Sequence, residues 1–241
     1  MRFAPVALLS CLLAFAGCKA DQANRRSSDI DVAAAASAAR ARAASKPLSH
    51  EEAARVDDGR PVIACFGDSI TAGYGTAAGE SYPDDLQRLL DQAGYRYRVV
   101  NLGVSGNTTK DGLDRVDRVM SLSPAITVVE FGGNDGLRGI PVANTRKNLD
   151  QILDKLAPTR TQIVLAGITL PPQFGQEYVR SFDETYHLAA EKHRIPLLPF
   201  IYKDVYGVPG YIQPDGVHAT AAGNRQVAKN IFNMLQPLLK K

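Results

Sequence analysis

The feature that most constrains the fold is a regular alternation, from Pro61 onward, of short apolar runs and longer amphipathic stretches. Runs that are apolar through several consecutive positions are typical of strands buried on both faces, as in parallel sheets. The runs that predict strands are Val62–Phe66, Arg98–Leu102, Ala125–Phe131, Gln162–Ile168 and Pro196–Phe200. Helices are predicted between and after them, at Tyr82–Ala93, Thr109–Met120, Asn144–Leu156, Glu177–His193 and Ala219–Leu239.

Strict alternation of strands and helices has one common architecture. Each strand–helix–strand unit makes a right-handed crossover, so the strands run parallel and helices cover both faces of the sheet. We therefore predict an α/β fold with three layers, α/β/α, around a doubly wound, five-stranded parallel sheet. In such sheets the ligand site lies beyond the carboxyl ends of the strands.

Residues 1–18 are predicted to be a signal peptide outside the fold. Arg2 supplies a positive start, and Pro5 to Ala16 is a nearly continuous apolar run. Its length suits a signal peptide and is short of the ~20 apolar residues needed to span a bilayer.

The end of this leader predicts a lipid anchor. Ala16 and Gly17, two small residues before Cys18, resemble the lipobox of bacterial lipoproteins, in which the cysteine is acylated. Phe15 stands where leucine is usual, so a plain signal peptide with an incidental cysteine is the alternative. Lys19 follows Cys18, where an aspartate would resemble a signal for inner-membrane retention. We expect lipidation at Cys18 and a place on the periplasmic side of the envelope, at the outer membrane. Otherwise the protein is expected to be periplasmic or secreted.

Residues 19–59 are predicted to be an alanine-rich, flexible tether. Ala33 to Ala44 is almost all alanine and has no apolar face to bury. About 40 flexible residues have an r.m.s. reach of roughly 35 Å, enough to hold a domain clear of a membrane. The folded domain is then expected to span residues 60–241.

Charge and cysteine content exclude some classes of function. The net charge is only +3, with no basic block, so no nucleic-acid partner is expected. The three cysteines, Cys11, Cys18 and Cys65, form no CxxC pair and no cluster with histidine, so no metal site is expected. The oligomeric state is left open, with a monomer favoured.

Chemistry-bearing residues follow three of the predicted strands and precede the last helix. Ser69, at a strand-to-helix turn, is either an exposed nucleophile or a helix cap. Gly106 and Asn134 lie in glycine-rich turns that also read as ordinary loops. Asp215 and His218 are three positions apart, so that the carboxylate can meet one imidazole nitrogen while the other faces a nucleophile.

Taken together and in order, these segments resemble the GDSL, or SGNH, hydrolases. The blocks are GDSIT at 67–71, VSGNT at 104–108, GGND at 132–135 and DGVH at 215–218, and the resemblance runs from Val62 to about Leu239. The segments VVEFGGNDGLRG and IPLLPF are similar to the bacterial thioesterase I/lysophospholipase/arylesterase branch. The resemblance implies a flavodoxin-like sheet.

The resemblance also implies residue roles. Ser69 matches the nucleophile, His218 the general base and Asp215 the carboxylate that orients it. The N–H groups of Ser69 and Gly106 and the amide of Asn134 match the oxyanion donors. Ala219 follows His218 where proline is frequent in the family, a change in the turn only. No metal or organic cofactor is implied.

The implied activity is hydrolysis of small-molecule or lipid esters through an acyl-enzyme. Aryl esters, acyl thioesters and lysophospholipids are the substrates of the matching branch. A carbohydrate O-acetyl esterase of the same fold is the alternative within the class. A non-catalytic envelope binding module is the alternative outside it, and a broken triad or oxyanion hole would mark one; all five site positions are present here.

Overall fold

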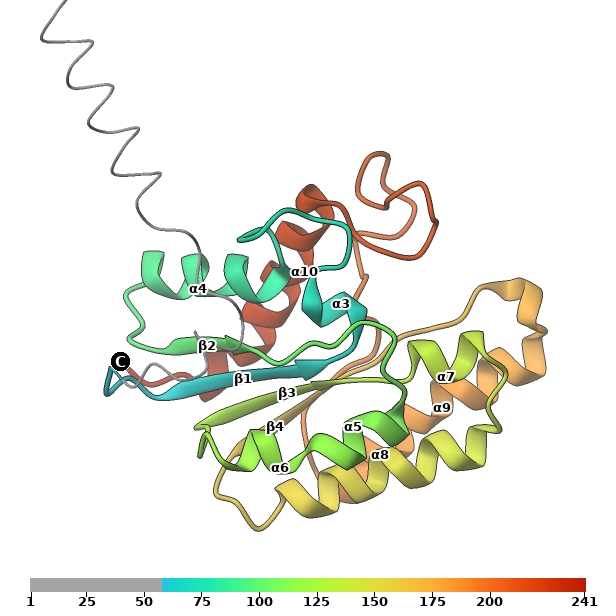
Figure 1. Ribbon diagram of the computed structural model, residues 1–241, viewed down its shortest axis with the longest axis horizontal. Helices are drawn as coiled ribbons and strands as arrows, with labels where there is room; N and C mark the ends of the chain where they lie inside the picture. Colours follow the sequence, from blue (N-terminus) through green and yellow to red (C-terminus); the bar gives the residue numbers. More distant parts are fainter. Residues whose placement is uncertain (1–57) are drawn as a thin grey trace, which may run out of the picture. The chain divides into compact units, whose positions relative to one another are not determined.

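Residues 58–241 of the chain are described by a computed structural model (Figure 1). The predicted signal peptide with Cys18, and the predicted tether up to residue 57, lie outside the described residues. Their assignments, and the boundary drawn at residue 60, stay predictions. No helix among residues 58–241 is long and apolar enough to cross a membrane.

The predicted doubly wound sheet is present. All strand pairs are parallel, and the spatial order is β2-β1-β3-β4-β5. This order is the flavodoxin-like arrangement, so the predicted fold class is confirmed. The strands are β1 (Val62–Gly67), β2 (Arg98–Asn101), β3 (Ile126–Glu130), β4 (Gln162–Ala166) and β5 (Leu197–Leu198).

The last strand is shorter and less buried than its sequence predicts. The run Pro196–Phe200 yields only the two residues of β5, both half-buried. β5 lies at the edge of the sheet and pairs with β4 alone, through Leu165 with Leu197 and Ala166 with Leu198. The prediction of a strand buried on both faces was therefore wrong here, because an apolar run does not reveal a position at the sheet edge.

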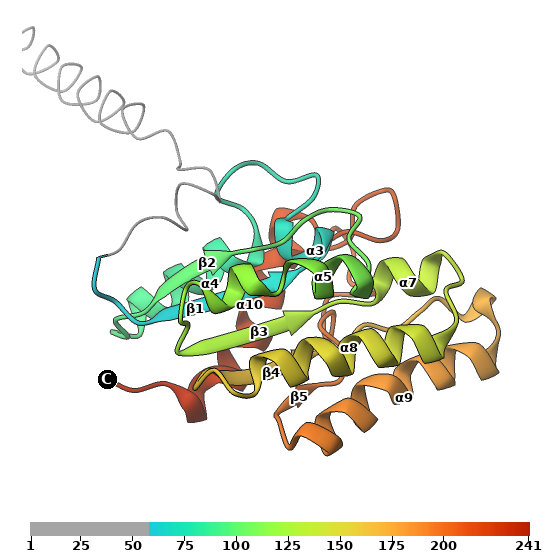
Figure 2. The same cartoon turned by 60° about the horizontal axis from the view of Figure 1, so that its bottom comes forward.

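Helices cover both faces of the sheet and complete the three layers. Figure 1 shows α4 and α10 on one face and α5, α6, α8 and α9 on the other, and Figure 2 brings α8 and α9 forward. The α-helices are α3 (Ser69–Ala72), α4 (Tyr82–Gln92), α5 (Thr109–Arg115), α6 (Asp117–Met120), α7 (Gly133–Leu137), α8 (Val142–Leu156), α9 (Gln176–His193) and α10 (Ala221–Leu235). Short 3₁₀ turns lie at η1 (Pro172–Phe174) and η2 (Gln236–Leu238).

Local capping explains where two of these helices begin. Ser81 and Asp84 form a capping box at the start of α4, each side chain accepting a hydrogen bond from the other's backbone N–H. Thr108 and Asp111 do the same for α5. Each box satisfies two backbone donors that the helix would otherwise leave free.

Three helix predictions need correction. The predicted helix Thr109–Met120 breaks at Val116, where the N–H of Val119 donates to the Val116 carbonyl (2.9 Å) in a tighter, three-residue turn. The last helix begins at Ala221 and not at Ala219, because Ala219 pairs with Ile212 in an isolated antiparallel bridge. No helix is predicted at α7, whose glycine-rich sequence also reads as an ordinary loop.

The order of the strands places the site. The chain leaves β1 for β2 on one side and returns to β3 on the other, so β1 lies between them. The last register pair of β1 and β3 is Gly67 with Glu130. Connections that leave adjacent strands toward opposite faces open a crevice at their carboxyl ends, and the segments carrying Ser69 and Asn134 begin there.

Candidate active site

Ser69 stands at the first position of a one-turn helix directly after β1. Asp68 caps this helix, its Oδ1 accepting from the N–H of Ile70 (3.0 Å). Gly67 has no room for a side chain, since a Cβ there would lie 2.5 Å from Oε2 and 2.7 Å from the carbonyl oxygen of Glu130. The sharp strand-to-helix turn therefore requires glycine, and it lifts Ser69 to the carboxyl edge of the sheet.

The structure brings Ser69, His218 and Asp215 into one hydrogen-bonded chain. The Oγ of Ser69 lies 2.9 Å from Nε2 of His218, and Nδ1 of His218 lies 2.7 Å from Oδ2 of Asp215. With Nδ1 protonated, Nε2 is free to accept the proton of the serine hydroxyl, which is the arrangement of a Ser–His–Asp triad.

Asp215 is held in its ionised form. Its Oδ1 accepts from the N–H groups of Val217 (2.9 Å) and His218 (3.0 Å). Burial raises the pKa of Asp215, but the hydrogen bonds from His218 and Val217 outweigh it and lower the pKa to about 2. The carboxylate is thus charged over the whole neutral range, as the partner of an imidazolium must be.

Gln213 and Tyr74 connect the loop that carries His218 to the segment that follows Ser69. Nε2 of Gln213 donates to the carbonyls of Tyr74 (2.8 Å) and Ala219 (2.8 Å), on either side of the site. The ring of Tyr74 lies against the His218 imidazole, with centroids 4.6 Å apart. Sequence reasoning missed both residues, because neither lies in the block that predicts the nucleophile or the base.

Asn134 is presented by α7, the short helix that the sequence did not predict. Its Nδ2 donates to Oδ2 of Asp68 (3.1 Å) and to the carbonyl of Asn107 (3.0 Å). The amide is therefore tied both to the serine turn and to the loop that contains Gly106.

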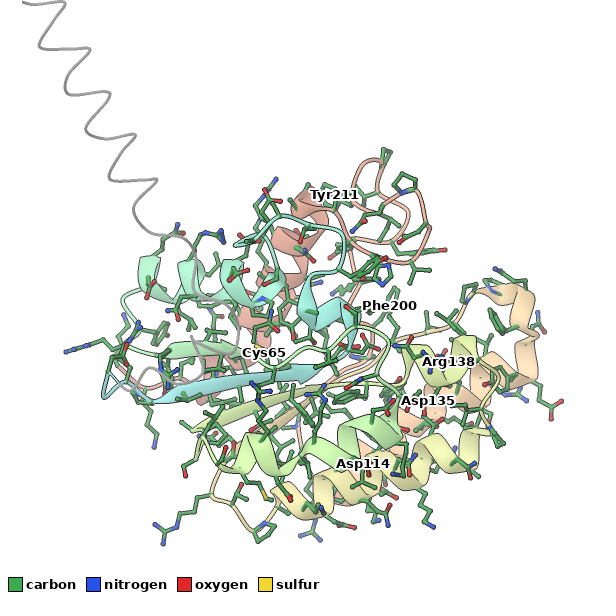
Figure 3. The ribbon with its side chains drawn as sticks, viewed as in Figure 1. Cys65, Asp114, Asp135, Arg138, Phe200 and Tyr211 are labelled. Atoms are coloured by element: carbon green, nitrogen blue, oxygen red, sulfur yellow. The ribbon has the colours of Figure 1, made fainter. Side chains whose placement is uncertain are left out.

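The next residue, Asp135, anchors this helix from below. Its buried carboxylate accepts from the backbone N–H (2.8 Å) and hydroxyl (2.5 Å) of Thr109 on α5 and from the hydroxyl of Thr145 (3.3 Å) on α8. Figure 3 shows Asp135 among these helices, on the side of α7 away from Phe200. The two adjacent side chains therefore differ in role: Asn134 binds the turns around Ser69 and Gly106, and Asp135 fixes α7 to α5 and α8.

Two backbone N–H groups in the turns after β1 and β2 have no hydrogen-bond partner among the described residues. Within residues 58–241, neither the N–H of Ser69 nor that of Gly106 donates a hydrogen bond. Gly106 has φ of 81°, in the left-handed region that favours glycine, and its carbonyl accepts from Nη2 of Arg138 (2.9 Å). In Figure 3 Arg138 and Phe200 lie at the same edge of the sheet, beyond the ends of the strands.

A buried acidic pair lies directly beneath the serine turn. Oε2 of Glu130 accepts from the Thr71 hydroxyl (2.8 Å) and from the N–H of Asp68 (3.3 Å). Burial raises the pKa of Asp68 to about 6, and burial together with the charge of Asp68 raises the pKa of Glu130 well above its usual range. Two carboxyl groups this close in an apolar interior do not ionise together easily.

A largely apolar cavity of about 490 Å³ opens beside the triad. Ser69, Asn134 and His218 supply polar groups in its wall. Most other lining side chains are aliphatic or aromatic: Ile70, Leu137, Ile168, Leu170, Pro171, Pro172, Val179, Phe200, Tyr202, Tyr206 and Val217. Such a cavity suits an apolar chain whose one polar end meets the hydroxyl of Ser69. Among residues 58–241 no cluster of His, Cys, Asp and Glu could hold a metal ion.

A Ser–His–Asp chain at the crevice of a doubly wound sheet, next to unpaired backbone donors, defines a serine hydrolase. The chain belongs to the GDSL-like lipase/acylhydrolase family, whose model matches residues 65–226. The resemblance read from the four sequence blocks is thereby confirmed.

Three known proteins illustrate the relationship. Esterase TesA of Pseudomonas aeruginosa is 38% identical over 174 residues, covering 72% of this chain and 87% of that protein. Thioesterase 1/protease 1/lysophospholipase L1 of Escherichia coli is 35% identical over 175 residues, covering 72% and 83%. The crystal structure of AlinE4, an SGNH-hydrolase family esterase, is similar with a TM-score of 0.63 at 40% identity and covers 77% of this chain and all of that one.

The acidic pair predicts how stability depends on pH. Asp68 binds its proton more tightly in the folded chain than in the unfolded one, so it lowers the free energy of unfolding as pH rises from about 4 through 6. Asp68→Asn should remove this contribution, on the order of 1–3 kcal/mol, and flatten the decline measured by urea unfolding between pH 4.5 and 7.5. Asp114→Asn, at an exposed ion pair with Lys110, should keep the wild-type slope. An unchanged slope in Asp68→Asn would contradict the assignment.

Proposed function

We propose that this chain is a serine esterase that hydrolyses carboxylic esters and thioesters with apolar acyl groups through an acyl-enzyme on Ser69. The observation that carries the proposal is the continuous chain from Ser69 Oγ through His218 to Asp215 at the mouth of an apolar cavity. Relatives named as an esterase and as a thioesterase/lysophospholipase support it.

The first half of the reaction forms the acyl-enzyme. Ser69 Oγ attacks the ester carbonyl carbon while Nε2 of His218 takes the hydroxyl proton, because a neutral serine is a weak nucleophile. Asp215 stabilises the resulting imidazolium. The tetrahedral intermediate then collapses, and the leaving alcohol or thiol takes the proton back from His218.

The second half repeats these steps with water. A water molecule gives its proton to His218, attacks the acyl carbonyl and releases the carboxylic acid, restoring the serine hydroxyl. In both halves negative charge develops on the former carbonyl oxygen. We assign its stabilisation to the N–H groups of Ser69 and Gly106 and to the Asn134 amide, because fixed donors aimed at developing charge lower the barrier strongly.

The hydrogen bonds that the Asn134 amide already makes bear on its assignment as an oxyanion donor. Both of its hydrogens are engaged in the unliganded chain, by Asp68 and by the Asn107 carbonyl. To serve the oxyanion it must share or exchange one of these bonds when charge develops.

The triad assignment is tested at the nucleophile. Ser69→Ala should lower kcat on p-nitrophenyl butyrate by several orders of magnitude, because no other hydroxyl contacts His218 Nε2 among the described residues. The melting temperature should stay close to that of the wild type, and fluorophosphonate should label the wild type at Ser69 alone. A folded Ser69→Ala variant with near-normal turnover would refute the proposal.

The apolar cavity favours an acyl chain longer than acetyl and argues against an O-acetyl esterase. Each buried methylene contributes about 0.8 kcal/mol, or roughly a fourfold gain in affinity for the transition state. We therefore expect kcat/KM to rise several-fold per methylene from p-nitrophenyl acetate to hexanoate.

A matched pair of variants locates the binding of the chain. Leu137→Asp places a charge in the cavity wall and should lower kcat/KM for hexanoate far more than for acetate. Leu188 lies on α9 outside the cavity and is 43% exposed, close to the 41% of Leu137. Leu188→Asp should therefore leave the ratio of kcat/KM for hexanoate to that for acetate unchanged. A flat chain-length profile in the wild type would overturn the proposed acyl site.

We propose further that the mature enzyme is anchored by lipid on Cys18 at the outer membrane. The support is the lipobox-like sequence before Cys18, which belongs to the part of the chain outside the described residues. Two or three acyl chains on a cysteine hold a protein firmly, whereas one chain binds only marginally.

The anchor is tested by fractionation. Cys18→Ser should move the enzyme from the membrane to the soluble fraction with unchanged kcat on soluble esters, since Ser69 lies far along the chain from the anchor. Cys11→Ser, inside the leader, should leave the distribution as in the wild type. Intact-mass measurement should show a lipid-bearing mature chain that starts at Cys18; a soluble, unmodified wild type would show that the leader is a plain signal peptide.

A further inference from the structure

One half-buried cation beside the site, Arg115, takes no part in the chemistry described above. The guanidinium of Arg115, the last residue of α5, donates to three oxygens in three directions. Nε reaches Oδ1 of Asn107 (2.6 Å), Nη1 reaches the Leu102 carbonyl (2.8 Å) and Nη2 reaches the Gly67 carbonyl (2.6 Å). These acceptors lie at the end of β1, just after β2, and in the turn that contains Gly106.

The surroundings of this guanidinium are unusual for a structural arginine. It lies over the ring of Phe66 at 4.5 Å and near that of Phe131 at 5.4 Å. None of its three hydrogen bonds goes to a carboxylate, since all three acceptors are uncharged. Burial lowers the pKa of Arg115 to about 10, which still leaves it protonated at neutral pH. A half-buried charge that binds only backbone and amide oxygens holds those oxygens in fixed positions.

The hydrogen bonds of Arg115 close a ring around the turn from Val104 to Asn107, which contains Gly106. The Gly67 carbonyl accepts from the N–H of Val104 (3.1 Å) as well as from Arg115, and the Val104 carbonyl accepts from the N–H of Asn107 (3.2 Å). Asn107 is in turn bound to Arg115 through its side chain. The turn from Val104 to Asn107 is therefore fixed at both ends to the strand that leads to Ser69.

Two of the proposed oxyanion donors depend on this ring. Gly106 immediately precedes Asn107, so the direction of its N–H follows from the placement of the turn. The Asn107 carbonyl also accepts from Nδ2 of Asn134 (3.0 Å) and so sets the position of that amide. The third donor, the N–H of Ser69, lies two residues after the Gly67 carbonyl that Arg115 binds.

We propose that Arg115 is a positioning residue for the oxyanion hole, acting through Asn107 and Gly67 to hold the donors of Gly106, Asn134 and Ser69 in register. This inference rests on the proposed esterase function. A planar fork of donors suits three acceptors in different directions, whereas a lysine ammonium is a single point. Arg115→Lys keeps the charge but cannot make the three contacts together.

The effect should appear in turnover and not in binding. Arg115→Lys should lower kcat on p-nitrophenyl butyrate about 10- to 100-fold, somewhat less than the loss of a whole oxyanion donor, while KM changes less than threefold. Asn107→Ala removes only the Nε contact and leaves the backbone carbonyl for Asn134, so it should show a smaller loss of the same kind. Arg118→Lys, exposed on α6 one turn later, should match the wild type.

A double-mutant cycle separates positioning from general destabilisation. If Arg115 acts through the oxyanion hole, Arg115→Lys should cost much less in an Asn134→Ala background than in the wild type. Multiplicative losses in the double variant, or a loss carried by KM, would overturn the inference. Should Arg115→Lys fail to fold, the same cycle with Asn107→Ala decides it. Failure of the proposed function itself looks different: Ser69→Ala would then retain activity, whereas here Ser69→Ala is inactive and only the Arg115 effect is missing.

Discussion

The parallel pairing of β1 with β2 on one side and β3 on the other is the constraint on which the rest depends. It makes three strands end at one edge, with Gly67 and Glu130 as the last register pair of β1 and β3. The segments that follow, with Ser69, Gly106 and Asn134, must then leave from neighbouring points. Hydrogen bonds among these segments complete what the sheet begins, because their ends are already close.

The carboxyl edge of the sheet also holds a network of polar groups that have little access to water. Asp68 and Glu130 are buried and Arg115 is half-buried, so burial raises the pKa of the two carboxyls and lowers the pKa of the guanidinium, which favours the neutral form of each. They are tolerated because almost every polar atom has a partner, although Oε1 of Glu130 has none among the described residues. Such networks are rigid when satisfied. A rigid support is what a hole for a short-lived oxyanion requires, since donors that are already placed need no reorganisation.

The same edge joins two opposite environments. Ser69, Asn134 and His218 supply polar groups to the cavity, and aliphatic and aromatic side chains from the segments after β4 and β5 form much of the rest of its lining. An ester with an apolar acyl group matches both, because its carbonyl meets the polar wall while its chain leaves water. The segment after β4 supplies Ile168, Leu170 and Val179 and carries no triad residue, so substitutions there can change chain-length preference without touching the triad, whereas the segment after β5 carries Asp215 and His218 as well.

Much of this protein was determined by local sequence. Apolar runs such as Val62–Phe66 and Ala125–Phe131 reveal buried strands because burial on both faces leaves no polar positions, and their alternation with helices leaves one sheet topology. The four blocks with Ser69, Gly106, Asn134 and the Asp215–His218 pair carry the family resemblance, because the chemistry permits few other residues there. Local pattern failed at β5 and α7: an apolar run looks the same at a sheet edge, and a glycine-rich turn gives no helical period.

Only the tertiary structure decided how these parts meet. Ser69 and His218 are separated by 149 positions, and their 2.9 Å contact depends on a long loop tied back through Gln213. Arg115 reads locally as the basic end of a helix, yet its guanidinium spans three segments that are distant in sequence. The upward shift in the pKa of Asp68 arises from its burial, and the segments that bury it include that of Glu130, 62 positions away. Contacts of this kind depend on the relative placement of loops, which long-range strand pairing sets and which no local pattern of residues encodes.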